Sequence, residues 1–103
     1  MQIDSRGVGE RTPVLSLSGR LDFTRRQEFL AAVDGFFNGL SMPVEVQLDC
    51  ANLTYLDSSG LGLLLVVRDR ARNLGCTVAL LGCNAGVREI LGTVQFGRLF
   101  RVS

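Results

Sequence analysis

The chain has 103 residues, 47% of them apolar and 20% charged, with a formal net charge of +1. This is the profile of one globular domain, and its near-neutral charge removes the electrostatic case for binding nucleic acid or an anionic membrane. The chain has no His, which excludes a Ser-His-Asp or Cys-His relay. All eleven basic residues are Arg, so the chain has neither a P-loop lysine nor a lysine that could form a Schiff base. With neither a membrane-length apolar run nor a signal peptide, we expect a cytoplasmic protein without membrane insertion.

The cysteines argue against a metal site. Cys50, Cys76 and Cys83 lie far apart and form no CxxC pair, and the chain offers no His to complete a zinc site. We therefore expect buried thiols that behave as small apolar side chains. We predict no catalytic residue, no metal and no cofactor.

The first half of the chain predicts two strands and a helix. Residues 2–6 and 14–18 have the pattern of a β-hairpin, and Gly19 is expected to close its second strand. Thr24 begins a Thr-Arg-Arg-Gln stretch typical of a capping box. An apolar stripe at helical spacing follows, and Gly39 is expected to end that helix. The stripe consists of Phe29, Leu30, Val33, Phe36 and Phe37.

The second half alternates strands and helices. Its expected elements are a strand over 44–50, a loop over 51–56, a helix from Ser58 to Leu74, a strand over 76–81, a helix capped by Asn84 and a short strand over 99–102. The order β-β-α-β-α-β-α-β predicts a single-domain α/β fold over residues 1–103. Its open mixed β-sheet should carry helices mainly on one face.

The stretch Leu-Asp-Ser-Ser-Gly-Leu-Gly (56–62) allows four interpretations. Asp57 is suited to cap the following helix, and Gly60 and Gly62 would let another backbone approach closely. A serine nucleophile conflicts with the missing His, and a phosphate cradle conflicts with the adjacent acid and the missing third glycine. A plain cap and a serine open to a kinase both remain. Ser58 and Ser59 point about 100° apart on a helix, so they cannot face the same partner atom.

Several segments together resemble the STAS domain family, especially bacterial anti-sigma factor antagonists. The resemblance spans nearly the whole chain in the right order, although members usually continue into a further C-terminal helix. Its segments are Gly19-Arg20-Leu21-Asp22, Leu48-Asp49, Leu56 to Gly62, Val87 to Leu91 and Phe96 to Phe100.

The resemblance implies a non-enzymatic binding module whose phospho-acceptor is Ser58. It implies two partners, an anti-sigma factor that is also a serine kinase and binds the ATP, and a serine phosphatase. The phosphorylated form would lose the anti-sigma factor. We expect a monomer or weak homodimer. The alternative is a non-catalytic STAS subunit of a membrane transport complex of the lipid-exporting ATPase type. The expected partner-binding residues are Asp22, Asp57, Ser58, Ser59, Gly60, Leu61 and Gly62.

Overall fold

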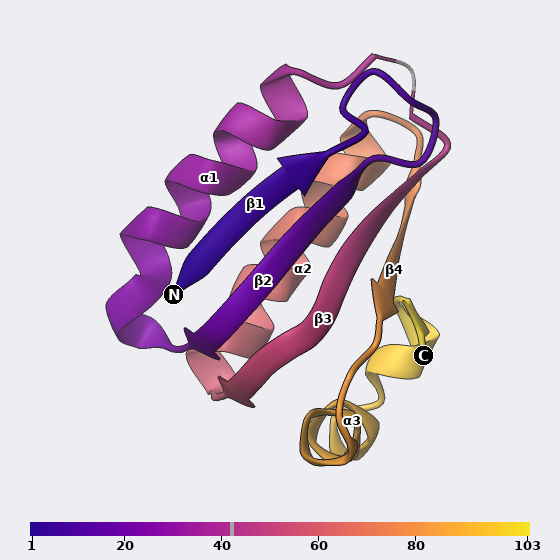
Figure 1. Cartoon of the computed structure of the whole chain (residues 1–103). Coiled ribbons are helices and arrows are strands. Elements are labelled where there is room, and N and C mark those ends of the chain that lie inside the picture. The colour runs from indigo at the N-terminus through magenta and orange to yellow at the C-terminus, as the bar shows by residue number, and fades with distance from the viewer. Residues whose placement is uncertain (42) are drawn as a thin grey trace.

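The computed structural model describes residues 1–41 and 43–103 and contains a five-stranded sheet in the order β1-β2-β3-β4-β5 (Figure 1). β1 pairs antiparallel with β2, and the other neighbours are parallel. The strands are β1 (Gln2–Arg6), β2 (Val14–Leu21), β3 (Glu45–Leu56), β4 (Thr77–Leu81) and β5 (Arg101–Val102). The expected mixed α/β sheet is confirmed.

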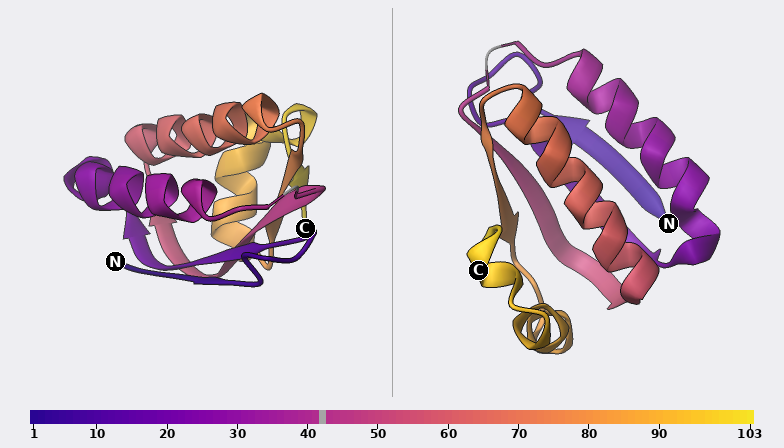
Figure 2. Two further views of the ribbon diagram at one scale, coloured as in Figure 1. Left: turned by 90° about the horizontal axis from the view of Figure 1, so that it is seen from above. Right: turned by 180° about the vertical axis from the view of Figure 1, so that it is seen from behind.

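Three helices make the crossovers between the parallel strands. They are α1 (Arg26–Asn38), α2 (Ser58–Asn73) and α3 (Ala85–Thr93), with short 3-10 turns at Phe23–Arg25 (η1) and Phe96–Arg98 (η2). Helices α1 and α2 lie side by side over one face of the sheet, and α3 lies near the end of β3 (Figure 2). No helix in the described part of the chain is long and apolar enough to span a membrane.

The core lies between the sheet and the two long helices. Phe29 and Val33 of α1 and Val67 of α2 are fully buried there, as the helical spacing predicts. All three cysteines are buried and free, which confirms their expected role as small apolar side chains. Between α1 and α2, Arg70 forms an ion pair with Asp34.

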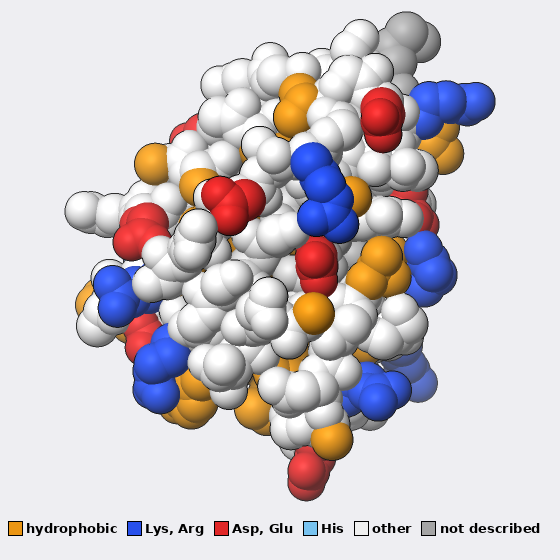
Figure 3. Space-filling view, viewed as in Figure 1, with side chains coloured by type: hydrophobic (Ala, Val, Ile, Leu, Met, Phe, Trp, Pro, Cys, Tyr) orange, Lys and Arg blue, Asp and Glu red, His pale blue; other side chains and the backbone are white. Residues whose placement is uncertain are grey.

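The opposite face of the sheet is polar. Arg101 pairs with Glu45 at 2.8 Å, and Arg6 lies 3.9 Å from Asp49. In the view of Figure 3, acidic and basic side chains are interspersed over the surface, without a large patch of one sign. This agrees with the alternation of apolar and polar residues in β3.

Two strand ends differ most from the sequence-based prediction, and the last strand begins at Arg101 and not at residue 99. β2 does not close at Gly19 but continues to Leu21, and the expected loop over 51–56 belongs to β3. The second halves of these strands pair with each other, with register shifts before Ser18 and Arg20. Gly19 adopts φ +97° at this irregularity, a conformation that glycine tolerates.

The predicted capping box at Thr24 was also wrong. Helix α1 begins at Arg26, and its N-cap residue is Arg25. Thr24 lies in the 3-10 turn η1 just before the helix, where its backbone N–H donates to Asp22 at 3.1 Å. The Asp22 carboxylate therefore caps η1, and Thr24 is the residue it holds.

The other helix ends follow the sequence. Asn84 caps α3 by accepting the Val87 N–H at 2.8 Å, and Gly39 follows the last residue of α1. Asn84 also donates to the Leu53 carbonyl at 3.1 Å, which attaches α3 to β3. Val94 follows the last residue of α3 and is exposed.

Candidate functional site

The candidate site lies where β2 and β3 end next to each other. Leu21 pairs with Leu56 as the last residues of the two strands. In parallel strands these carboxyl ends meet at one edge, so Asp22 and Asp57, the next residues along the chain, are neighbours. Thr54 fastens the two strands further by donating its hydroxyl to the Gly19 carbonyl at 3.1 Å.

Asp57 begins α2 as predicted. Its backbone is extended, its carbonyl accepts the Leu61 N–H at 2.9 Å, and its carboxylate accepts the Gly60 N–H at 2.8 Å. Such a cap stabilises a helix start by about 1 kcal/mol. Ser58 is the first residue of the helix and is exposed. The local sequence therefore places an accessible hydroxyl on a firmly held helix start.

The two glycines of the motif serve different purposes. A Cβ at Gly60 would lie 2.3 Å from the Leu21 carbonyl oxygen and 2.7 Å from a methyl carbon of Leu56. Gly60 thus allows α2 to rest on the end of β2, the close backbone approach predicted for the motif. A Cβ at Gly62 would meet no atom of the described residues within 4 Å. Packing inside the chain therefore does not explain Gly62.

Gly62 lines a surface cavity of about 320 Å³ between the starts of α1 and α2. Ser59 and Val66 contribute to its α2 side, and Arg26 and Leu30 line its α1 side. The cavity borders on an unusual surface residue, the Phe23 side chain, which is 69% exposed. An exposed aromatic beside an apolar hollow is typical of a protein contact surface.

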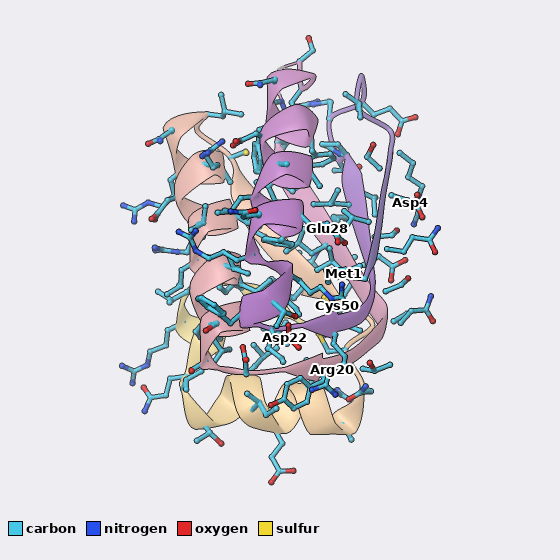
Figure 4. All side chains as sticks on the ribbon, turned by 90° about the vertical axis from the view of Figure 1, so that its left-hand side faces the viewer. Met1, Asp4, Arg20, Asp22, Glu28 and Cys50 are labelled. Atoms are coloured by element: carbon cyan, nitrogen blue, oxygen red, sulfur yellow. The ribbon has the colours of Figure 1, made fainter. Side chains whose placement is uncertain are left out.

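Asp22 is held by a second set of contacts. Its Oδ1 accepts both the hydroxyl and the backbone N–H of Thr24, and its Oδ2 lies 3.5 Å from Arg20 Nε. The Thr24 hydroxyl, with smaller contributions from the Thr24 amide and Arg20, lowers the pKa of Asp22 despite opposing desolvation. The Arg20 guanidinium also stacks 4.0 Å above the centre of the Tyr55 ring. Arg20 and Asp22 mark this end of the sheet in Figure 4.

The structure brings most of the predicted site residues to one end of the molecule but gives them different directions. Ser58 is exposed, whereas Ser59 faces the cavity with Gly62. Leu61 packs against the core, and Gly60 is buried beneath the helix start.

Sequence reasoning missed Phe23, Arg20 and Tyr55. Phe23 directly follows the Asp22 of the Gly-x-Leu-Asp segment, but its exposure depends on the η1 turn. The Arg20–Tyr55 contact depends on the pairing of β2 with β3. Neither feature has a local sequence signal.

The site combines the exposed Ser58 hydroxyl with a carboxylate that is already hydrogen-bonded. The Asp57 carboxylate is committed to the Gly60 N–H. No group of three or more metal-ligating side chains occurs within residues 1–41 and 43–103. Hydrogen bonding to Cys83 and burial raise the pKa of the Cys50 thiol, so it stays protonated.

Comparison with known proteins identifies relatives over nearly the full chain. Residues 5–101 match the family model described as "Mlab, STAS domain". A STAS-domain containing protein of Pseudomonas aeruginosa strain UCBPP-PA14 is 37% identical over 89 residues, which cover 86% of this chain and 85% of that protein.

Two solved structures share the fold. The Bacillus cell fate determinant SpoIIAA, in its phosphorylated form, matches 99% of this chain and 91% of its own with a TM-score of 0.70 and 20% identity. A putative anti-sigma factor antagonist of Thermotoga maritima matches 97% of this chain and 84% of its own with a TM-score of 0.83 and 19% identity.

Proposed function

The chain belongs to the STAS domain family, and on that premise we propose that it is an anti-sigma factor antagonist controlled by phosphorylation. The unphosphorylated form binds an anti-sigma factor that is also a serine kinase, and thereby releases a sigma factor in the cytoplasm. The kinase transfers the γ-phosphoryl group of its ATP to the Ser58 oxygen, and ADP leaves. A separate serine phosphatase hydrolyses the phosphoserine and restores binding.

The position of Ser58 carries this proposal. Its hydroxyl is exposed at the first residue of α2, and the helix start beneath it is fixed by the Asp57 cap and the Gly60–Leu21 contact. A phosphate at a helix N-terminus is favoured by the helix dipole, so the fold tolerates the modification. SpoIIAA, which shares this fold, has been solved in both unphosphorylated and phosphorylated forms.

Charge accounts for the loss of binding. Phosphorylation adds about −1.5 to −2 charge next to Asp57 and near Asp22. A partner docked there would then cover a poorly paired dianion. A hundredfold loss of affinity corresponds to about 2.8 kcal/mol. Like-charge contacts at an interface cost several kcal/mol, so a local change is sufficient.

The contact surface is expected to extend from Ser58 over the cavity between α1 and α2. Ser59 and Gly62 line this cavity, and Phe23 projects beside it. Gly60 and Leu61 contribute by fixing the position of the helix start rather than by exposed area. Exposed aromatic side chains beside a pocket often dominate the affinity of an interface, and we assign Phe23 that role.

The assignment of Ser58 is tested with a matched pair of variants, Ser58→Ala and Ser59→Ala. Each is incubated with the candidate kinase encoded in the same genome and ATP, and phosphorylation is located by mass spectrometry. We expect Ser58→Ala to remain unmodified and Ser59→Ala to be phosphorylated. Calorimetry should show at least a hundredfold weaker kinase binding by the phosphorylated chain. Phosphorylation of Ser58→Ala but not of Ser59→Ala would contradict the assignment.

A second candidate function is that of a non-catalytic STAS subunit in a membrane transport complex of the lipid-exporting ATPase type. The family description names Mlab, and the exposed Phe23 would also suit a permanent contact, which is usually more apolar than a transient one. Affinity capture with the wild type and Ser58→Asp separates the two functions. Equal recovery of a membrane ATPase by both would support the transport subunit, whereas loss of a serine kinase with Ser58→Asp would support the antagonist.

A further inference from the structure

We propose that Arg20 is the residue of this chain that responds to phosphorylation of Ser58, by exchanging the Asp22 carboxylate for the phosphate. This inference rests on the proposed function, because it concerns the regulation of the same site. It assigns a role to a side chain that the motif does not include. In the unmodified chain, Arg20 bridges Asp22 and the ring of Tyr55.

The fold brings Arg20 to the right end of the sheet. Arg20 pairs with Tyr55, one position before the last pair of β2 and β3, Leu21 with Leu56. Ser58 follows Leu56 by two residues, and Gly60 rests directly on the Leu21 carbonyl. The Arg20 Nε lies 3.5 Å from Oδ2 of Asp22, the residue that follows the strand. The proposal requires the Arg20 side chain, which is several ångströms long, to turn from Asp22 toward a phosphate on Ser58.

The present contacts of Arg20 are weak enough to exchange. Its Nε lies 3.5 Å from Asp22, longer than the roughly 2.7–2.9 Å of a strong charge-assisted hydrogen bond. Its side chain is 59% exposed, and exposed ion pairs contribute little to stability. Asp22 does not depend on Arg20, because Thr24 donates two hydrogen bonds to its other oxygen. Releasing Arg20 therefore leaves the η1 cap intact.

The phosphate is the stronger partner for a guanidinium. It carries about −1.5 to −2 charge against −1 for a carboxylate, and it accepts two parallel N–H bonds from arginine. The exchange also relieves repulsion between the phosphate and the carboxylates of Asp22 and Asp57. Tyr55 loses the guanidinium that stacks on its ring, so its environment changes with the state of Ser58.

Arg26 provides the matched control. It is exposed at the start of α1, but it lines the cavity that Ser59 and Gly62 face. Adjacent helix residues point about 100° apart, and Ser59, not Ser58, lines the cavity with Arg26. The proposal therefore pairs Arg20, and not Arg26, with a phosphate on Ser58. Replacing either arginine with glutamine removes the same charge from an exposed position.

The test uses the full chain with phosphoserine introduced at position 58 during synthesis, so no kinase is required. The phosphate is titrated by phosphorus NMR in wild type, Arg20→Gln and Arg26→Gln. We expect Arg20→Gln to move the titration midpoint upward by about half a pH unit, since a nearby cation favours the dianion. Arg26→Gln should move it less. The ring signals of Tyr55, the chain's single tyrosine, should shift on phosphorylation in the wild type and much less in Arg20→Gln.

An equal or smaller midpoint change in Arg20→Gln than in Arg26→Gln would overturn the proposal. So would Tyr55 ring signals that respond to phosphorylation equally with and without Arg20. Neither result depends on a kinase or a sigma factor. A chain that is never phosphorylated at Ser58 in its cell would refute the proposed function and leave this measurement valid, so the two failures are distinguishable.

Discussion

The two glycines of the Asp-Ser-Ser-Gly-Leu-Gly stretch provide the sharpest test of the site. A Cβ at Gly60 would lie 2.3 Å from the Leu21 carbonyl oxygen, about 1 Å closer than an ordinary contact. That oxygen belongs to the backbone of a paired strand and cannot rotate away. Overpacking of this kind costs about 1–3 kcal/mol or more, and the gain in helix propensity over glycine returns only about 1 kcal/mol. We expect Gly60→Ala to lower the free energy of unfolding by about 2 kcal/mol.

Gly62→Ala is the matched control for Gly60→Ala, with an expected effect on stability of the opposite sign. Its Cβ would enter open space among the described residues, so no clash opposes the higher helix propensity of alanine. The free energy of unfolding should therefore rise by about 1 kcal/mol. Urea unfolding and thermal unfolding, each followed by circular dichroism, measure both variants. For a domain of this size, the melting temperature should fall by about 10 °C in Gly60→Ala and rise by about 5 °C in Gly62→Ala.

The same pair of variants separates stability from binding. If position 62 lacks a side chain because a docked partner packs against it, Gly62→Ala should be more stable than the wild type and bind the kinase more weakly. A Gly60→Ala chain as stable as the wild type would refute the close contact between α2 and β2. A Gly62→Ala chain with unchanged partner affinity would remove this residue from the proposed contact surface.

Two further predictions concern the β2–α1 junction. Phe23→Ala should weaken kinase binding at least tenfold in calorimetry while the urea midpoint stays unchanged, because the side chain is 69% exposed; a lower midpoint with unchanged binding would assign Phe23 to folding instead. The pKa of Asp22 is lowered in the folded chain from its ordinary value of 3.8, so its carboxylate stabilises the fold above about that pH, and the contribution is lost as the pH falls through the folded pKa. The stability difference between wild type and Asp22→Asn should therefore be full at pH 7 and shrink below pH 3.8, and a difference that stays constant across this range would contradict the Thr24 and Arg20 contacts as its cause.

Local signals in the sequence predicted the local parts of the fold. Asp57 and Asn84 were recognisable as caps because a capping side chain bonds to an N–H only three residues ahead. The same reasoning failed at Thr24, where the capping residue of the preceding turn, Asp22, competes for the threonine. A capping pattern in the sequence shows which residue types could cap a helix. It does not show which of two adjacent turns they cap.

Strand pairing between segments far apart in the sequence could not be predicted from local patterns. The second half of β3 looked like a loop because its order depends on β2, more than thirty residues earlier. The different roles of Gly60 and Gly62 were hidden for the same reason, since only Gly60 has the Leu21 carbonyl across from it. Ser58 itself was predicted as the phospho-acceptor from the family resemblance, and that role remains a prediction.

The contact between Gly60 and the end of β2 has a consequence for the speed of switching. A helix start that rests on a strand backbone offers little room for rearrangement. Under the proposed function, the two forms of the site would then differ in charge and in a few surface side chains, without a slow conformational step between them. Release of the partner after phosphorylation would be governed by its dissociation rate alone, and rebinding after hydrolysis of the phosphoserine would need no refolding time.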